Sequence, residues 1–239
     1  MNLKTPSIHI LGGKINLIHF SDILKTIIFH RTENIFLQIL TVNTLMLLES
    51  EKDPILQKIF FSKNTLSIPE STGIFIYCLI KKQKKIQKTP GIDLMNRLCE
   101  HANKNQWSIY LLGAKPGVAE QTQNKLQLRF PNLIISGLNH GYFNNEEELK
   151  ILNEIQTKKP HLLFVALQMP DQEKWIYKNS NYFKGICAMG IGGSFDVISG
   201  NLKRAPLLIQ KLGMEWLYRL IQEPWRWKRI LKLTLLFFK

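Results

Sequence analysis

The sequence WSIYLLGAKPG, residues 107–117, joins an apolar run to a corner rich in glycine and proline. The apolar run 107–112 predicts a buried strand. The corner between Gly113 and Gly117 ends that strand, and we expect a helix after it as far as Phe130. A strand, a glycine corner and a helix in this order form the repeating unit of α/β proteins.

The same unit recurs on both sides of this stretch. Further strands are predicted at 36–42, 65–68, 133–136, 161–167 and 185–189, and helices at 44–48, 74–80 and 146–156, with Pro170 opening another helix. At least five strands with helices between them predict a mostly parallel, Rossmann-like sheet covered by helices on both faces. Such sheets bind ligands beyond the carboxyl ends of their strands.

Composition supports one globular domain and excludes several classes of protein. Of the 239 residues, 45% are apolar and 21% charged, which suffices for a real core and argues against disorder. No apolar run approaches the roughly 18–20 residues of a membrane-spanning helix, and the start lacks a secretory signal pattern. We therefore expect a cytoplasmic protein. Cys78, Cys99 and Cys187 are widely spaced and odd in number, so we expect them buried and unpaired.

The charge balance predicts an anionic partner. The formal net charge is +14, and residues 207–239 hold seven cations against two acids, a balance of +5. We expect an α/β domain over residues 1–206 and a basic, aromatic-rich, amphipathic helical appendage over residues 207–239. This tail either lies on an anionic membrane surface or packs its apolar side against the domain. A homo-oligomer also stays possible.

Several familiar sites lack their sequence patterns. There is no Asp-x-Asp pair and no cluster of histidine or cysteine at metal spacing, so we expect no bound metal. The corner 113–117 lacks the Gly-Lys-Ser/Thr of a Walker loop, and Gly192-Gly193-Ser194 lacks the closing glycine of a nucleophile elbow. No third glycine follows Gly190 and Gly192 in register, which disfavours a nicotinamide site. We expect no cofactor.

Glu70 is the most notable carboxylate. It lies between Pro69 and a Ser-Thr-Gly turn, at the expected ligand edge of the sheet. A carboxylate there can act as a general base toward a sugar hydroxyl. By spacing alone, the favoured interpretation is instead an acid that stabilises the start of a helix through the helix dipole. The five lysines between Lys81 and Lys88 can meet a diphosphate or simply form a solvated loop.

Short motifs follow one another along most of the chain. They are Thr41-Val42-Asn43, Gly91-Ile92-Asp93-Leu94, Gly141-Tyr142-Phe143, Pro170-Asp171-Gln172-Glu173, Gly192-Gly193-Ser194-Phe195-Asp196, Lys203-Arg204-Ala205-Pro206, the run EWLYRL at 215–220, and Glu223-Pro224. In this order they resemble the WecG/TagA/CpsF family of bacterial glycosyltransferases, from about residue 41 to residue 229.

The resemblance implies an inverting, metal-independent transferase. Its donor would be a UDP-sugar of the N-acetylmannosamine type, and its acceptor an undecaprenyl-diphosphate-linked acetylglucosamine. The product would serve the synthesis of cell-surface polysaccharide or of the teichoic acid linkage. The reaction would take place at the inner leaflet, so the resemblance implies a cytoplasmic protein that is peripheral on the inner face of the cell membrane.

The resemblance also implies roles for individual residues. Glu70 stands where the family has its proposed catalytic aspartate, and Thr41 and Asn43 would position substrate beside it. Gln172 would hold the nucleotide sugar. The other expected substrate contacts are Lys88, Gly91, Asp93, Gly113, Tyr142, Glu173, Gly192, Gly193, Asp196 and Arg204. The lipid diphosphate would be held by Arg219, Arg226 and Arg229, because guanidinium groups meet phosphate oxygens in pairs.

Three positions depart from the family pattern. Glu70-Ser71 replaces Asp-Gly, Lys88 replaces an arginine, and Gln168 replaces a glycine. These departures keep open an alternative, a catalytically degenerate member that binds nucleotide sugar or lipid diphosphate. The charge of +14 also raises a nucleic-acid-binding hypothesis, but no reader helix or stacking motif supports it, so we expect no nucleic acid partner.

Overall fold

A computed structural model of the chain describes residues 5–81 and 88–227. Its main sheet has six parallel strands in the order β4-β3-β8-β7-β5-β6. They are β3 (Leu37–Val42), β4 (Thr65–Pro69), β5 (Ser108–Gly113), β6 (Ile134–Asn139), β7 (Leu162–Ala166) and β8 (Cys187–Gly190). The α/β prediction with a mostly parallel, Rossmann-like sheet is confirmed, and the predicted strand ends are within a few residues of those observed.

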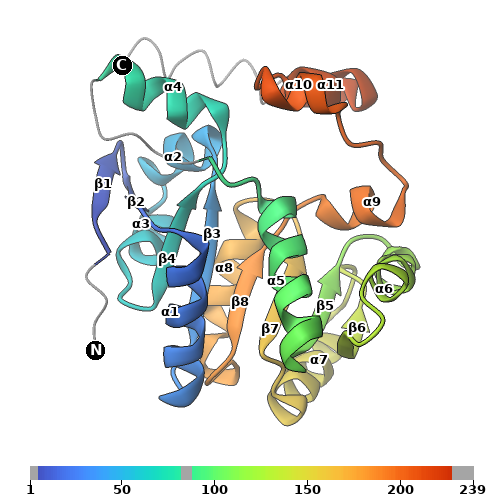
Figure 1. Ribbon diagram of the computed structural model, residues 1–239. Coiled ribbons are helices and arrows are strands. Elements are labelled where there is room, and N and C mark those ends of the chain that lie inside the picture. Colours follow the sequence, from blue (N-terminus) through green and yellow to red (C-terminus); the bar gives the residue numbers. More distant parts are fainter. Residues whose placement is uncertain (1–4, 82–87, 228–239) are drawn as a thin grey trace.

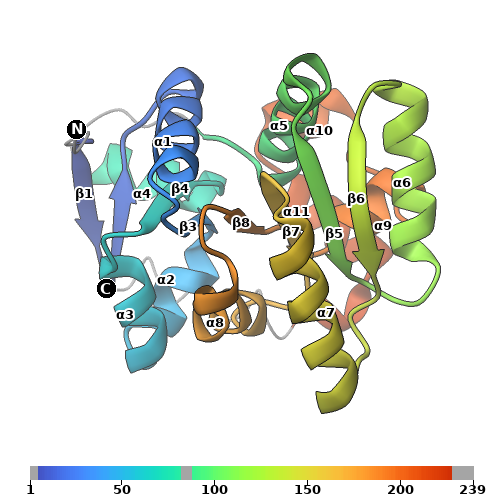
Figure 2. The same cartoon turned by 90° about the horizontal axis from the view of Figure 1, so that it is seen from below.

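Helices cover both faces of this sheet (Figures 1 and 2). One face packs against α1 (Phe20–Thr32), α5 (Gly91–Asn105), α6 (Val118–Arg129) and α9 (Ser194–Ser199). The other face packs against α2 (Thr44–Ser50), α3 (Pro54–Phe61), α4 (Thr72–Ile80), α7 (Asn145–Lys158) and α8 (Asp171–Lys178). Short 3₁₀ turns follow α8 at Ser180–Tyr182 and α11 at Pro224–Arg226. After α9 come α10 (Leu207–Lys211) and α11 (Glu215–Gln222).

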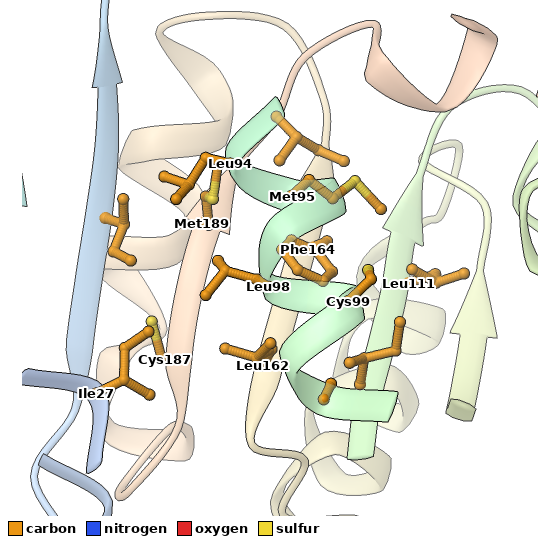
Figure 3. Packing of buried hydrophobic residues seen from close by; sticks show 14 of the residues in the cluster. Ile27, Leu94, Met95, Leu98, Cys99, Leu111, Leu162, Phe164, Cys187 and Met189 are labelled. Atoms are coloured by element: carbon orange, nitrogen blue, oxygen red, sulfur yellow. The ribbon is translucent and has the colours of Figure 1, made fainter. Parts of the chain in front are cut away.

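The largest part of the core lies between α5 and the middle strands (Figure 3). Leu94 and Leu98 on α5 are fully buried, as are Leu111 on β5 and Phe164 on β7. Alternate residues of each strand point to the opposite layers. The middle strands are therefore apolar on both sides, as parallel strands covered by helices usually are.

Local sequence signals explain where several helices begin. The Asn43 side chain accepts a hydrogen bond of 3.0 Å from the Met46 N–H and so caps α2, the helix predicted at 44–48. Asp53 caps α3 in the same way, directly before Pro54. Asn144 and Glu147 form a capping box at the start of α7.

The sequence patterns did not reveal the first elements of the chain. Strands β1 (Ser7–Ile10) and β2 (Gly13–Asn16) form an antiparallel hairpin, followed by α1. The hairpin turn places Leu11 at a φ of 51°, a conformation that turn chemistry normally reserves for glycine or asparagine. Asn16 joins the hairpin to the main sheet by accepting a hydrogen bond from the Ser67 N–H.

Two further expectations concern the cysteines and membrane-spanning helices. Cys78, Cys99 and Cys187 are free and buried, as predicted. Among the helices within residues 5–81 and 88–227, none has the length and apolar character needed to cross a membrane.

Candidate active site

The candidate site lies at the carboxyl edge of the sheet, at the upper end of the molecule in Figure 1. Glu70 follows β4, Asn43 follows β3, and Gly192 follows β8. Strands β4, β3 and β8 are neighbours in the sheet, so parallel pairing brings their ends together. This edge is where open α/β sheets bind their ligands.

The carboxylate of Glu70 is held by the first residue of α5. Its Oε1 accepts a hydrogen bond of 3.0 Å from the Gly91 N–H, and its own N–H donates to the Val42 carbonyl at 2.8 Å. A Cβ atom at position 91 would lie 3.0 Å from Glu70 Oε1 and 3.3 Å from Thr41 Oγ1. The glycine therefore lets the start of α5 approach both side chains closely.

Opposing effects act on the pKa of Glu70. Burial raises the pKa of this carboxyl, while the Gly91 N–H and the nearby charges of Arg219 and Lys88 lower it, and Glu215 raises it again. The net direction is upward. A carboxylate with a raised pKa is a stronger base once it is ionised, so the environment suits general base catalysis.

Thr41 connects this corner to the end of β8. Its side chain is buried and its Oγ1 donates to the Gly190 carbonyl at 3.3 Å. Asn43 caps α2 through its side-chain oxygen, as described above. Both residues lie at the end of β3, which neighbours β4 and Glu70. The contacts described for them support the fold, and their expected roles in positioning substrate stay predictions.

Gln172 and Glu173 form a buried link to the glycine-rich turn after β8, residues 190–193, which we call the glycine corner. Gln172 Oε1 accepts a hydrogen bond of 2.9 Å from the Gly192 N–H, and its Nε2 donates to Glu173 Oε1 at 2.7 Å. Both side chains are at most 4% exposed. Gln172 therefore fixes the backbone at Gly192 in this structure, and the role that the resemblance implies for it, holding the nucleotide sugar, stays a prediction.

Glu173 is a carboxyl group without full pairing. Its Oε2 is buried and has no hydrogen-bond partner within the described residues. Burial raises the pKa of Glu173 to about 7, although the Gln172 amide lowers it, and the charge of Glu70 raises it further. The charge of Glu70 therefore acts on Glu173, even though the two residues follow different strands.

Arg219 on α11 reaches back over the glycine corner. Its guanidinium lies so close to Gly193 that a Cβ atom there would clash with Nη2. Its Nε donates to Glu223 Oε2 at 2.9 Å. The positive charge also acts on Asp196, whose pKa is raised by burial and lowered by Arg219, raised by Glu223 and lowered by Lys115.

A second group of charges fixes α11 beside Glu70. Arg204 pairs with both oxygens of Asp93, at 2.7 Å each, and its Nε lies 3.9 Å from Glu215 Oε1. Lys88 pairs with Glu215 Oε2 at 3.2 Å and donates to Thr72 Oγ1 at 3.2 Å. This chain of ion pairs connects α5, the loop before α10, α11 and α4.

The remaining residues that were expected to contact substrate lie away from Glu70 or outside the described residues. Gly113 ends β5, where its φ of 123° and its close approach to the Ala166 backbone require glycine for the fold. Tyr142 is 66% exposed in the loop after β6, at the opposite edge of the sheet from β4. The Arg226 side chain and the whole of Arg229 lie outside the described part of the chain.

Sequence reasoning gave Glu215 and Lys115 no role in the site. Glu215 pairs with Lys88 and approaches Arg204, and Lys115 influences Asp196 from the corner after β5. One signal was present in the sequence, because Glu215 and Glu223 are the two acids in a cationic tail. Each of them pairs with a cation close to the site.

The arrangement combines a carboxylate base with cations and backbone N–H groups. Glu70 can take a proton, and Lys88 and Arg219 can balance negative charge that develops beside it. Within the described residues, no three histidine, cysteine, aspartate or glutamate side chains gather as a metal site would require. Fold and site together fit the class of α/β enzymes that catalyse group transfer.

Comparison with known proteins identifies the family. Residues 8–239 match the WecG/TagA/CpsF family of glycosyl transferases, and the chain belongs to that family. It is 34% identical over 232 residues to the N-acetylglucosaminyldiphosphoundecaprenol N-acetyl-beta-D-mannosaminyltransferase of Bacillus subtilis (strain 168), covering 97% of this chain and 89% of that protein. It is 37% identical over 163 residues to the protein of the same name from Staphylococcus aureus (strain MW2), covering 68% of this chain and 62% of that protein.

Proposed function

We propose that this protein transfers an N-acetylmannosamine-type sugar from UDP to the acetylglucosamine of an undecaprenyl-diphosphate-linked acceptor. The names of the Bacillus and Staphylococcus relatives support this sugar and this acceptor. The observation that carries the proposal is the setting of Glu70, whose carboxylate is fixed by the Gly91 N–H with the charges of Lys88 and Arg219 nearby. A base beside a cationic region is what transfer from a sugar diphosphate requires.

In the proposed step the acceptor hydroxyl attacks the anomeric carbon of the donor sugar. Glu70 takes the hydroxyl proton, the new C–O bond forms, and the bond between the anomeric carbon and the diphosphate oxygen breaks. UDP leaves with that electron pair. Direct attack from the opposite side inverts the anomeric configuration, whereas a retaining reaction would pass through a covalent glycosyl-enzyme intermediate.

The departing diphosphate needs positive charge and hydrogen-bond donors. Arg219 lies over Gly193, and Lys88 is held beside Glu70 by Thr72 and Glu215. An arginine meets phosphate oxygens with two parallel N–H groups, and a lysine acts as a compact charge. The resemblance gave Arg219 to the lipid diphosphate. Because its guanidinium lies over Gly193, we assign it instead, together with Lys88, to the departing donor diphosphate, and we assign Gln172 to the positioning of the turn at Gly192.

The acceptor is anchored in a membrane, so the enzyme must work at the membrane surface. We place it on the inner face of the cell membrane as a peripheral protein, with its basic tail toward anionic lipid. Support comes from the tail's balance of +5 and from exposed aromatic side chains such as Trp216 and Trp225. Cations near an anionic leaflet contribute about 1 kcal/mol each to binding.

The decisive experiment measures UDP release from a panel of UDP-sugars with a short-chain lipid-diphosphate acetylglucosamine acceptor. We expect release that depends on the acceptor with UDP-N-acetylmannosamine, and its loss in Glu70→Gln. Glu100→Gln is the matched control, because Glu100 is an exposed acid on α5 that pairs with Lys104. UDP binding without release from any donor would contradict the proposal and indicate a binding protein.

A further inference from the structure

Helix α4 has no polar face. Its residues, Thr72–Ile80, read TGIFIYCLI and include no charged side chain. A helix at the surface of a protein normally turns polar residues to the solvent, and a helix that is apolar all around is normally covered. In α4 only part of the apolar surface is covered, since Ile74 and Cys78 pack into the core while Leu79 and Ile80 are 57% and 64% exposed.

The uncovered side of α4 lies at the same end of the molecule as further exposed apolar side chains. Helices α10 and α11 lie at the same end of the molecule (Figure 1), and Gly213 between them packs against Thr72 at the start of α4. They and the turn after them expose further large apolar side chains. These are Leu207, Leu208, Leu212, Met214, Trp216, Ile221, Trp225 and Trp227. Apolar surface gathered in this way marks a binding face.

The candidate active site lies between α4 on one side and α10 and α11 on the other. Lys88 donates to Thr72 on α4 and pairs with Glu215 on α11, so both helices flank the corner that holds Glu70. Lys81 follows α4 and is exposed, and Lys211 ends α10 and is exposed as well. The acids of α11, Glu215 and Glu223, are each paired with a cation of the same chain.

We propose that α4 is a second membrane-docking element, which enters the headgroup layer of an anionic bilayer together with α10 and α11. The inference rests on the proposed function, because a lipid-linked acceptor requires the site to meet the bilayer. Exposed cations beside apolar side chains, with tryptophans among them, are the features that suit a headgroup layer. Docking on both sides of Glu70 directs the site toward the membrane surface, where the acceptor diphosphate lies.

The test compares the full chain with Leu79→Ser/Ile80→Ser in sedimentation with vesicles of phosphatidylglycerol and phosphatidylcholine. We expect binding to weaken at least about tenfold, because two exposed apolar side chains leave the layer. The control Leu128→Ser/Leu149→Ser removes exposed leucines from α6 and α7 and should stay within about twofold of the unchanged protein. Sedimentation requires no turnover, so this result stands apart from the outcome of the transferase assay.

Turnover supplies a second readout. The α4 variant should use a short-chain, water-soluble acceptor at the normal rate and lose rate only with a long-chain acceptor in vesicles. Unchanged vesicle binding would overturn the proposal. So would a lower melting temperature with vesicle binding intact, which would indicate that α4 is covered by the chain itself. Loss of a dimer with vesicle binding intact would indicate that a second copy covers α4.

Discussion

The carboxylate of Glu70 accepts a hydrogen bond of 3.0 Å from the backbone N–H of Gly91, the first residue of α5. The start of a 15-residue helix therefore faces the proposed base. The helix dipole favours the ionised carboxylate, while burial favours the neutral acid. The interpretation of Glu70 as an acid at a helix start thus describes part of its setting, and its role as the base stays a prediction.

Replacing Glu70 by glutamine should lower turnover by about 10²–10⁴-fold, because the amide cannot take the acceptor proton. UDP binding should stay within about threefold, since the cations are unchanged. Activity of the unchanged enzyme should rise with pH through the raised pKa of Glu70, and this acid limb should disappear from the residual activity of the variant. Initial rates from pH 4 to pH 8 and calorimetric titration of UDP provide the measurements.

Glu70→Asp tests whether the departure from the family residue matters. The shorter side chain withdraws the carboxylate by one methylene, and about 1 Å of misplacement can cost roughly 10²-fold in rate. In this site the length of the glutamate side chain lets Oε1 reach the Gly91 N–H. We therefore expect Glu70→Asp to be slower than the unchanged enzyme and faster than Glu70→Gln, and a faster aspartate variant would refute this.

Gly193→Ala should displace Arg219 without unfolding the protein. A methyl group at position 193 meets only the end of a flexible side chain, and Gly193 has a negative φ of −78° that alanine adopts readily. We expect about tenfold weaker UDP binding, the loss of one charge-assisted contact. In the Arg219→Ala background the same substitution should have almost no effect, and an equal effect in both backgrounds would show that Gly193 acts independently of Arg219.

Lys88→Ala should raise the KM for the donor by about tenfold, because a positive charge is lost beside the diphosphate. Lys88→Arg should retain most of the activity, since a guanidinium can still reach Thr72 and Glu215. Lys25→Ala is the control, because Lys25 forms an exposed ion pair with Asp22 on α1. If Lys88→Ala changed only the melting temperature and left KM unchanged, the lysine would serve the docking of α11 alone.

Sequence patterns predicted the sheet well, because parallel strands buried on both faces read as continuous apolar runs. They also predicted the helix after Asn43, because a cap depends only on residues close together in the sequence. The hairpin β1–β2 was missed because its turn depends on Leu11 at a positive φ. No local pattern marks that conformation in a leucine.

The site was predictable only as far as residue types and strand ends allow. Glu70 and Thr41 follow from strand order, but the partner of Glu70 is a backbone N–H 21 residues away. Glu215 pairs with Lys88 across 127 residues, and such a contact depends on how α11 docks on the domain. The resemblance implied that Gln172 holds the nucleotide sugar, and only the structure shows that its amide is engaged by Gly192 and Glu173.

Glu173 should make stability depend on pH. In the unfolded chain its pKa is near the ordinary 4.5, and in the folded protein it is about 7. The stabilisation of the folded protein by neutral Glu173 is fully present below pH 4.5 and is lost as the pH rises through 7. This loss corresponds to roughly 3 kcal/mol of the free energy of unfolding. Denaturant unfolding of Glu173→Gln from pH 4.5 to pH 8 should therefore give a flatter profile. Glu100→Gln is the exposed control, and parallel profiles for Glu173→Gln and the unchanged protein would contradict the assignment.

Removing residues 207–239 should leave the α/β domain folded. Among the described residues, the buried apolar core ends at Ala205, and α11 is held by surface contacts such as the pair between Gln222 and the Lys203 backbone. Such contacts contribute about 1–2 kcal/mol together, so the melting temperature should fall by only a few degrees. Turnover should be lost because Arg219 is absent, and vesicle binding should drop to the residual contribution of α4. A truncated chain without near-ultraviolet circular dichroism would instead show that α10 and α11 are required for core packing.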